Sequence, residues 1–303
     1  MRRVLRIIGW GLLALVGLVL VIYVGASVQA SRRLARTYEV EVPALTIPTD
    51  PESLARGEHL LAGVVSCRTC HGEDFSGSVA DDIPPLLRMQ PPNITGGAGT
   101  RTEHYTDADW VRTVRHCVNP EGRGLFIMPC GNYTDLSDAD LGAIIAVIRA
   151  APDVPATSRG GIELYWLGRA MLGLGFFDDY LPADHIDHTA PRGAEPDASD
   201  PIAVGRYLAV TGGCHECHGA GLSGGPMPGA PPSLPPPRNL TETGIGAWSD
   251  EEFARAMREG TTPDGRTLGA ERPWRTFARM TDEELANLRA YLRSVPPLEY
   301  GNR

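Results

Sequence analysis

The sequence contains no lysine, and all 28 of its basic residues are arginine. Six of these arginines precede the first acidic residue, Glu39, so residues 37–303 carry the other 22 against all 37 acidic residues, a formal charge of −15. A surface of that sign repels a phosphate backbone, which argues against nucleic acid as a partner. Cysteine is also scarce, because six in 303 residues are too few for a scaffold built on disulfides.

Charge is absent from residues 7–26, an apolar run of 20 residues. At ~1.5 Å per residue, a helix of this length matches the ~30 Å hydrocarbon core of a bilayer. Three arginines precede the run, which favours a cytoplasmic N-terminus and places the rest of the chain outside the cytoplasm. We therefore expect residues 1–36 to be a membrane anchor. A signal peptide cleaved after Val28-Gln29-Ala30 is the alternative, although the run is longer than the ~7–15 residues of a usual signal core.

Two stretches of the chain, about 52–152 and 200–297, repeat each other from end to end. Each opens with a helical segment, passes through Cys-x-x-Cys-His and then Asn-Ile-Thr or Asn-Leu-Thr, and closes with apolar residues at helical spacing. Both repeats also contain an internal helix start. Thr106 and Ser249 suit the N-cap position, and Asp109 and Glu252 suit the third helical position. The sequence predicts two all-α domains, 37–152 and 200–303, joined by a linker at 153–199.

Four of the six cysteines lie in the two Cys-x-x-Cys-His motifs. Such a motif attaches haem covalently, because its two thiols add to two porphyrin vinyl groups and the adjacent His reaches the iron as proximal ligand. We expect two haem c groups, whose apolar rings supply the interior that short helices and Gly- and Pro-rich loops lack. A redox dithiol or part of a zinc site is the alternative. The residues are Cys67, Cys70 and His71 in the first repeat, and Cys214, Cys217 and His218 in the second.

The sixth iron ligand is expected from a loop late in each repeat. In the first repeat this loop holds Met128, and a His/Met pair raises the reduction potential of an electron-transfer haem. A core Met that fills a gap is the alternative. In the second repeat, alignment of the closing helices puts Arg272 at this position, and arginine is a poor iron ligand because it stays protonated. The second haem therefore has either an open coordination site or another ligand. Three methionines could substitute, but each has a simpler explanation: Met227, Met257 and Met280.

Cys117 and Cys130, the two remaining cysteines, lie 13 residues apart in the first repeat. In an oxidising compartment, a disulfide between them would close the loop that holds Met128. Free thiols are the alternative.

The linker and the remaining histidines have structural interpretations. Residues 161–172 are apolar enough to pack as a helix between the two domains, which would fix the separation of the haems. His59 is expected to pack on the first helix, and His104 and His116 to lie on a loop and a helix surface. A haem contact by His185 or His188 in the linker is the less favoured alternative, because a lone His is usually structural or solvated.

The paired motifs, the Met-Pro loop, the Asn-Ile-Thr and Asn-Leu-Thr segments and the closing helices together resemble bacterial membrane-anchored di-haem c-type cytochromes. The resemblance covers most of residues 38–303 and implies a tandem pair of class I cytochrome c-like domains after an N-terminal transmembrane helix. It also implies anchorage in the cell inner membrane, with the haem domains in the periplasm. The implied partners are redox proteins: a dehydrogenase subunit, an oxidase or a soluble cytochrome. Arg272 departs from the family pattern.

We therefore expect an electron carrier that links a periplasmic dehydrogenase or another donor to the respiratory chain. This function needs no catalytic acid, base or nucleophile. An open iron at the second haem would suit two other functions. One is a peroxidase-like enzyme in which Arg272 polarises the bound oxygen, and the other is a gas sensor.

Overall fold

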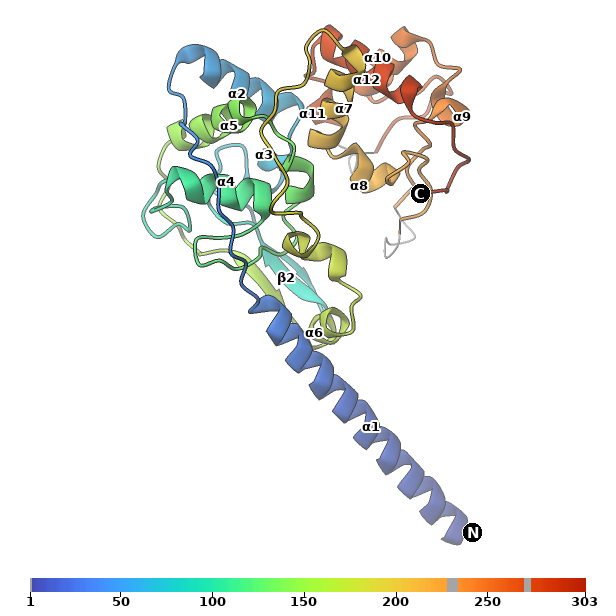
Figure 1. The fold of residues 1–303 in the computed structure, drawn as a ribbon. Coiled ribbons are helices and arrows are strands. Elements are labelled where there is room, and N and C mark those ends of the chain that lie inside the picture. The colour runs from blue at the N-terminus through green and yellow to red at the C-terminus, as the bar shows by residue number, and fades with distance from the viewer. Residues whose placement is uncertain (1, 228–233, 270–273) are drawn as a thin grey trace.

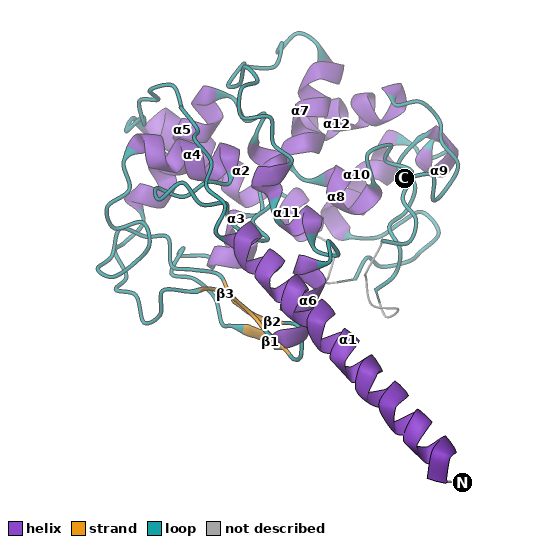
Figure 2. Ribbon diagram, turned by 60° about the horizontal axis from the view of Figure 1, so that its bottom comes forward, coloured by secondary structure: helices purple, strands orange, loops and turns teal. Residues whose placement is uncertain are grey.

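The computed structural model describes residues 2–227, 234–269 and 274–303, and it shows two helical lobes at one end of a long helix (Figure 1). The first repeat forms one lobe and the second repeat forms the other. The predicted fold, two tandem helical domains after an N-terminal helix, is confirmed, with one small sheet in addition (Figure 2).

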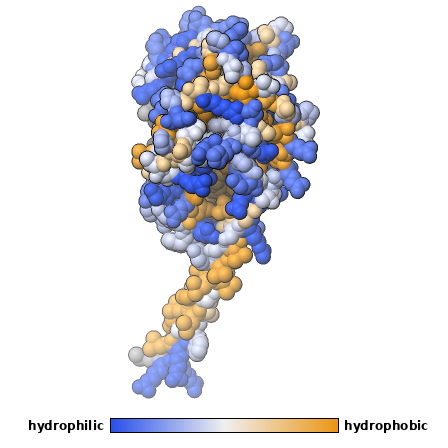
Figure 3. All heavy atoms as spheres, turned by 90° about the vertical axis from the view of Figure 1, so that its left-hand side faces the viewer, coloured by the Kyte–Doolittle hydropathy of each residue, from blue (hydrophilic) through white to orange (hydrophobic). Residues whose placement is uncertain are grey.

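Helix α1 (Arg2–Leu34) projects from the lobes as an apolar stem (Figure 3). Its large apolar side chains are exposed on all sides, and among its described residues only Ala26 and Ala30 are buried. By length and composition the helix could cross a membrane. A helix that is apolar all round is stable only where protein or hydrocarbon surrounds it, so this stem suits a bilayer.

The two lobes are built from matching helices that cross at matching glycines. In the first lobe, a Cβ on Gly57 would lie 2.2 Å from the carbonyl oxygen of Ala143, and in the second a Cβ on Gly205 would lie 2.0 Å from that of Asn287. Only glycine permits such close crossings. The first lobe contains α2 (Pro51–Gly63), α3 (Cys67–His71), α4 (Asp107–His116), η1 (Cys130–Tyr133) and α5 (Asp138–Ala150). The second contains α7 (Pro201–Thr211), α8 (Cys214–His218), α9 (Glu242–Ile245), α10 (Asp250–Glu259), α11 (Trp274–Phe277) and α12 (Asp282–Ser294).

Both predicted internal helix starts are confirmed as capping boxes. The Thr106 hydroxyl accepts from the amide of Asp109 at the start of α4, and Ser249 accepts from Glu252 at the start of α10. In each case the acidic side chain also accepts from the backbone amide of the cap residue. These reciprocal bonds satisfy amides that the first turn of a helix leaves without partners.

The linker departs from the expected helix over 161–172. Residues 161–164 form strand β3 (Gly161–Leu164), which pairs antiparallel with β2 (Leu87–Gln90), and β2 pairs with β1 (Asp81–Ile83). Gly160 and Gly161 both have positive φ angles, a conformation that glycine adopts readily and that interrupts a helix. The helix begins only at α6 (Trp166–Gly173). It packs beside the end of α1 rather than between the lobes (Figures 1 and 2).

Equivalent contacts hold the two lobes together. In each, a residue on the first helix of one lobe contacts a carboxylate at the start of the closing helix of the other lobe. His59 on α2 contacts Glu284 at the start of α12, with Nε2 2.8 Å from Oε2. Tyr207, the equivalent of His59 on α7, donates to Oδ2 of Asp140 at the start of α5, at 2.7 Å. The Arg56 guanidinium reaches both carboxylates. His59 is therefore an interface residue, not merely a packing residue, and the two repeats are related across the interface as two subunits of a symmetric dimer would be.

The end of the linker is a strap that crosses the first lobe. After two short turns, η2 (Asp178–Tyr180) and η3 (Pro182–Asp184), the strap places His188 against His116, with their Nδ1 atoms 3.1 Å apart. His116 is 5% exposed, so the expectation of a helix-surface position was wrong. Burial is the main cause that lowers the pKa of His116 to about 4, and His188 and nearby arginines lower it further.

We expect Tyr207→Phe to lower the free energy of unfolding by about 1.5–3 kcal/mol, because it removes a hydrogen bond to a buried carboxylate. The measurement is denaturant unfolding of the full chain in detergent, followed by circular dichroism. Tyr300→Phe is the matched control, since Tyr300 is 54% exposed. Equal stability of the two variants would show that the Tyr207 hydroxyl does not hold the lobes together.

Acidification should destabilise the docked strap. A histidine whose pKa is lowered in the folded state, from 6.5 to about 4 for His116, binds its proton more readily when unfolded. The contribution of this neutral histidine to the free energy of unfolding is therefore fully present above about pH 6.5. It decreases, by about 3 kcal/mol in total, as the pH drops to about 4. His116→Asn should lose less stability than the parent between pH 7.5 and pH 5. The exposed His104 provides the control His104→Asn, which should behave like the parent, and identical pH dependence in all three proteins would contradict the prediction.

Candidate haem-attachment sites

Both Cys-x-x-Cys-His motifs form short helices, α3 and α8, at the same point of each lobe. Burial raises the pKa of the Cys67 thiol to about 12, and it raises that of Cys214 to about 12 as well. A redox dithiol or a zinc site requires thiolates, which these surroundings disfavour. Among the described residues, no group of three or more His, Cys, Asp or Glu side chains could hold a metal ion. The raised pKa values of the two thiols thus favour thioether attachment over either alternative.

A backbone carbonyl orients the histidine of each motif. Nδ1 of His71 lies 2.8 Å from the carbonyl oxygen of Pro92, and Nδ1 of His218 lies 2.6 Å from that of Arg238. Since a carbonyl only accepts, the ring proton is on Nδ1, and Nε2 is the basic nitrogen that can ligate a metal. Burial lowers the pKa of His71, which also keeps the ring neutral.

These carbonyls were missed by the sequence argument, although the repeat contained the signal. Each carbonyl immediately precedes the Asn of the Asn-Ile-Thr or Asn-Leu-Thr segment. Asn93 accepts from the amide and hydroxyl of Thr95 and donates to the carbonyl of Val154. Asn239 makes the same bonds with Thr241 and with the carbonyl of Leu298. The repeated Asn and Thr thus fix the loop that holds the histidine.

The first lobe contains an apolar cavity of about 740 Å³, its mouth included. Both His71 and Met128 line it, so the two predicted axial ligands share one cavity, with Cys67 at its wall. The other apolar lining residues include Ile94, Trp110, Val114, Leu125, Ile144 and Ile148. Arg101 also lines this cavity. A pocket of this size and composition fits a large flat apolar group with a charged edge.

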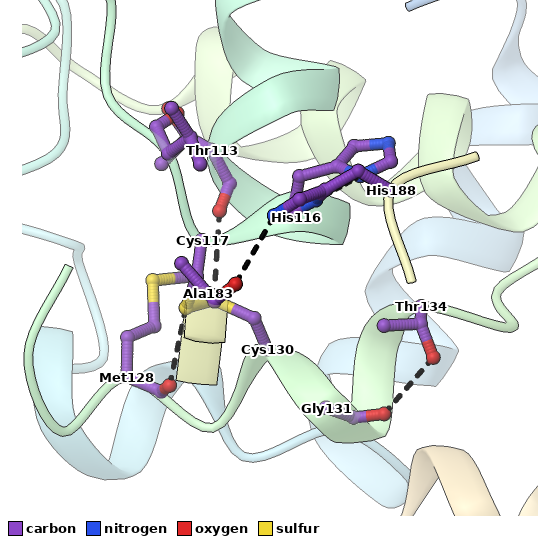
Figure 4. The surroundings of a disulfide bond; sticks show 10 residues. Thr113, His116, Cys117, Met128, Cys130, Gly131, Thr134, Ala183 and His188 are labelled. Atoms are coloured by element: carbon purple, nitrogen blue, oxygen red, sulfur yellow. Dashed lines mark hydrogen bonds between the residues drawn. A yellow bond between two sulfur atoms is a disulfide. The ribbon is translucent and has the colours of Figure 1, made fainter. Parts of the chain in front are cut away.

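The structure joins Cys117 and Cys130 in a disulfide beside Met128 (Figure 4). Cys117 is the left-handed C-cap of α4, and Cys130 begins η1 two residues after Met128. Both cysteines are fully buried. The bridge therefore ties the Met128 loop to the end of α4. Among the residues that the structure describes, neither His185 nor His188 lines this cavity or the corresponding cavity of the second lobe. His185 contacts the carbonyl of Asp178, whereas His188 contacts the carbonyl of Ala183 and the rings of His116 and Tyr38.

The second lobe contains a cavity of about 1170 Å³, its mouth included. Cys214, Cys217 and His218 line it together with Met227 and Met257. Met280 is buried in the common core and does not line the cavity. Arg272 lies outside the described residues. At the end of α10, Gly260 is a left-handed C-cap like Cys117, and the Trp274 ring lies directly over it.

Comparison with known proteins agrees with this geometry. The family model of cytochrome c matches residues 202–296, and that of cytochrome c oxidase, cbb3-type, subunit III matches residues 52–148. The chain is 25% identical to the cytochrome c subunit of the quinone alcohol dehydrogenase of Gluconobacter oxydans, over 97% of this chain and 61% of that protein. It is 26% identical to the fructose dehydrogenase cytochrome subunit of Gluconobacter japonicus, over 82% of this chain and 55% of that protein. A third relative is the gluconate 2-dehydrogenase cytochrome c subunit of Pantoea cypripedii, 33% identical over 36% of this chain and 27% of that protein.

The chain thus spans somewhat more than half the length of the first two relatives. The two family matches coincide with the two lobes and include both Cys-x-x-Cys-His helices. Each of the two repeats matches a family model of cytochrome c type, so the chain contains two cytochrome c domains in tandem behind an N-terminal apolar helix.

Proposed function

We propose that this protein is an electron carrier with two covalent haem c groups, one in each lobe. Cys67 and Cys70 would hold the first group and Cys214 and Cys217 the second, each thiol adding across a vinyl double bond with no net oxidation. The observation that carries the proposal is the pair of Nδ1-to-carbonyl bonds, because they direct His71 and His218 toward ligation in matching cavities. When bound, each haem supplies reversible one-electron chemistry at its iron.

The residues around each cavity control the potential and exclude water. The apolar walls lower the local dielectric constant, and a thioether from Met128 would favour the ferrous state of the first haem. Arg101 at the first cavity and Arg238 at the second are placed to meet the carboxylates at the edge of a porphyrin.

Electrons would pass between the haems directly across the lobe interface. Tyr133 on η1 lines the first cavity and is buried. Its neighbour Asn132 faces the start of the second motif, since a Cβ on Gly213 would lie 2.8 Å from Nδ2 of Asn132. The attachment helix of one lobe therefore begins beside the loop that closes the other cavity. The exchanged contacts of His59 and Tyr207 would keep the distance between the haems constant.

We infer that the lobes work in the periplasm, held at the inner membrane by α1. The relatives are cytochrome subunits of alcohol, fructose and gluconate dehydrogenases, which supports a dehydrogenase subunit as electron donor. An oxidase or a soluble cytochrome of the respiratory chain would then accept the electrons. The acidic lobes suit a basic docking surface on such a partner.

Haem counting tests the attachment residues. The purified full chain should give two haems per chain in a pyridine haemochrome assay. The double variant Cys67→Ala/Cys70→Ala should retain one haem, and Cys214→Ala/Cys217→Ala should retain the other. A parent protein with one haem, or a double variant that still holds two, would contradict the assignment.

Ligation by Met128 predicts a spectroscopic change in its variant. Met128→Leu keeps the side-chain volume but removes the sulfur donor, so the reduced protein should bind CO at the first haem and the reduction potential of that haem should fall. Met280→Leu, in the core shared by the two lobes, is the matched control and should leave both properties unchanged. An unaltered CO difference spectrum in Met128→Leu would mean that another group is the sixth ligand.

The CO spectrum of the parent protein also separates the carrier from the two other functions. If CO perturbs neither haem, both irons are six-coordinate and the protein is a carrier. If CO perturbs about half of the signal, the second iron is accessible, and turnover of peroxide then distinguishes a peroxidase-like enzyme from a gas sensor.

A further inference from the structure

Helix α6 ends in a turn that leaves two large apolar side chains exposed. Gly175 has a φ of +90°, its amide donates to the carbonyl of Leu172, and the amide of Phe176 donates to that of Met171. This is a Schellman motif, in which the apolar residue after the glycine usually packs back onto the helix. Here Phe176 is instead 70% exposed, and Leu174 is 56% exposed. The described residues therefore leave most of each of these two side chains uncovered.

The contacts between α6 and α1 show where this turn lies along the stem. The Arg169 guanidinium donates to Oγ of Ser31 at 2.6 Å. Four residues later, a Cβ on Gly173 would lie 1.9 Å from the carbonyl oxygen of Ala26. Helix α6 therefore runs antiparallel to α1 and descends from the level of Ser31 to that of Ala26. Ala26 is the last residue of the uncharged apolar run, so the turn lies where that run ends.

Charges near the turn set how deeply it could enter a bilayer. Arg33 donates to the carbonyl of Leu172 and pairs with Asp178, while Arg32, the residue before it on α1, is exposed. These arginines lie at the height expected for lipid phosphates. Asp179 is exposed and would resist entry into hydrocarbon. The turn therefore suits the boundary between headgroups and acyl chains rather than the bilayer core.

We propose that the turn Leu174–Phe176 is a second, interfacial membrane contact, seated in the outer leaflet beside α1. The proposal rests on the membrane crossing of α1 inferred above. Its occupant is the lipid interface, because the turn is continuous with the end of the apolar run of α1. Two contacts instead of one would hold the cytochrome domains at a fixed tilt to the membrane, which a single helix cannot do.

The test is photolabelling of the full chain in nanodiscs of phosphatidylethanolamine and phosphatidylglycerol with a diazirine that partitions into the bilayer. Peptide mass spectrometry then locates the label. The turn should be labelled as strongly as residues 22–25 of α1, and several-fold more than Val79 or Ile202, which are exposed apolar residues outside α1 and α6 (88% and 44%). Because the diazirine partitions into the bilayer and no redox partner is present, labelling of the turn reports its contact with lipid.

Two outcomes distinguish the failure of this proposal from the failure of the anchor. If residues 7–26 are labelled and the turn matches Val79, the interfacial contact is wrong and the turn faces water or a protein partner. If residues 7–26 are themselves unlabelled, the membrane crossing is wrong and both proposals fall. Phe176→Asp should reduce labelling of the turn several-fold without changing that of α1, and the matched Val79→Asp should change neither.

Discussion

An apolar cavity at the centre of each repeat is the constraint on which the rest of the structure depends. The helices of one lobe are too short, and the loops between them too rich in Gly and Pro, to fill their own interior. Instead of filling the interior, the helices and loops form the walls of the cavity. Glycine crossings bring the first and last helices of each repeat together, and Asn93 and Asn239 fix the loops that carry the histidine acceptors. A bound macrocycle would convert the exposed cavity walls into a core, so attachment of haem and stability of the fold should be coupled.

The interface between the repeats follows from the same duplication. His59 and Tyr207 occupy equivalent positions on the first helices, and Asp140 and Glu284 occupy equivalent positions at the start of the closing helices. Each ring contacts the carboxylate of the other repeat. Because the contact is used twice, it resists rotation of one lobe on the other. This rigidity serves electron transfer, since the rate of tunnelling falls steeply as the distance between the cofactors increases.

Residues that act locally could be predicted from the sequence, and residues that act through tertiary contacts could not. The helix starts at Thr106 and Ser249 are set by neighbours three residues away, and both are confirmed. The apposition of His71 and Met128 follows from the family pattern, and the structure places both at one cavity. By contrast, the burial of His116 depends on a strap more than 70 residues away in the sequence. The strand at 161–164 depends on pairing with residues 87–90, which the local apolar pattern does not reveal.

The two lobes differ most in how they hold the loop opposite the proximal histidine. In the first lobe a disulfide joins Cys117, at the end of α4, to Cys130 beside Met128. In the second lobe Gly260 replaces Cys117 as the left-handed cap, and the Trp274 ring packs on it in place of the bridge. A ring stacked on a glycine restrains a loop less than a covalent bond does. The lobe that contains Met128 therefore also contains the disulfide. The other lobe, in which alignment puts Arg272 at the position of Met128, has the Trp274 ring at Gly260 instead. A covalent restraint suits the proposed role of Met128, because an iron ligand must keep its sulfur on the metal through each change of oxidation state.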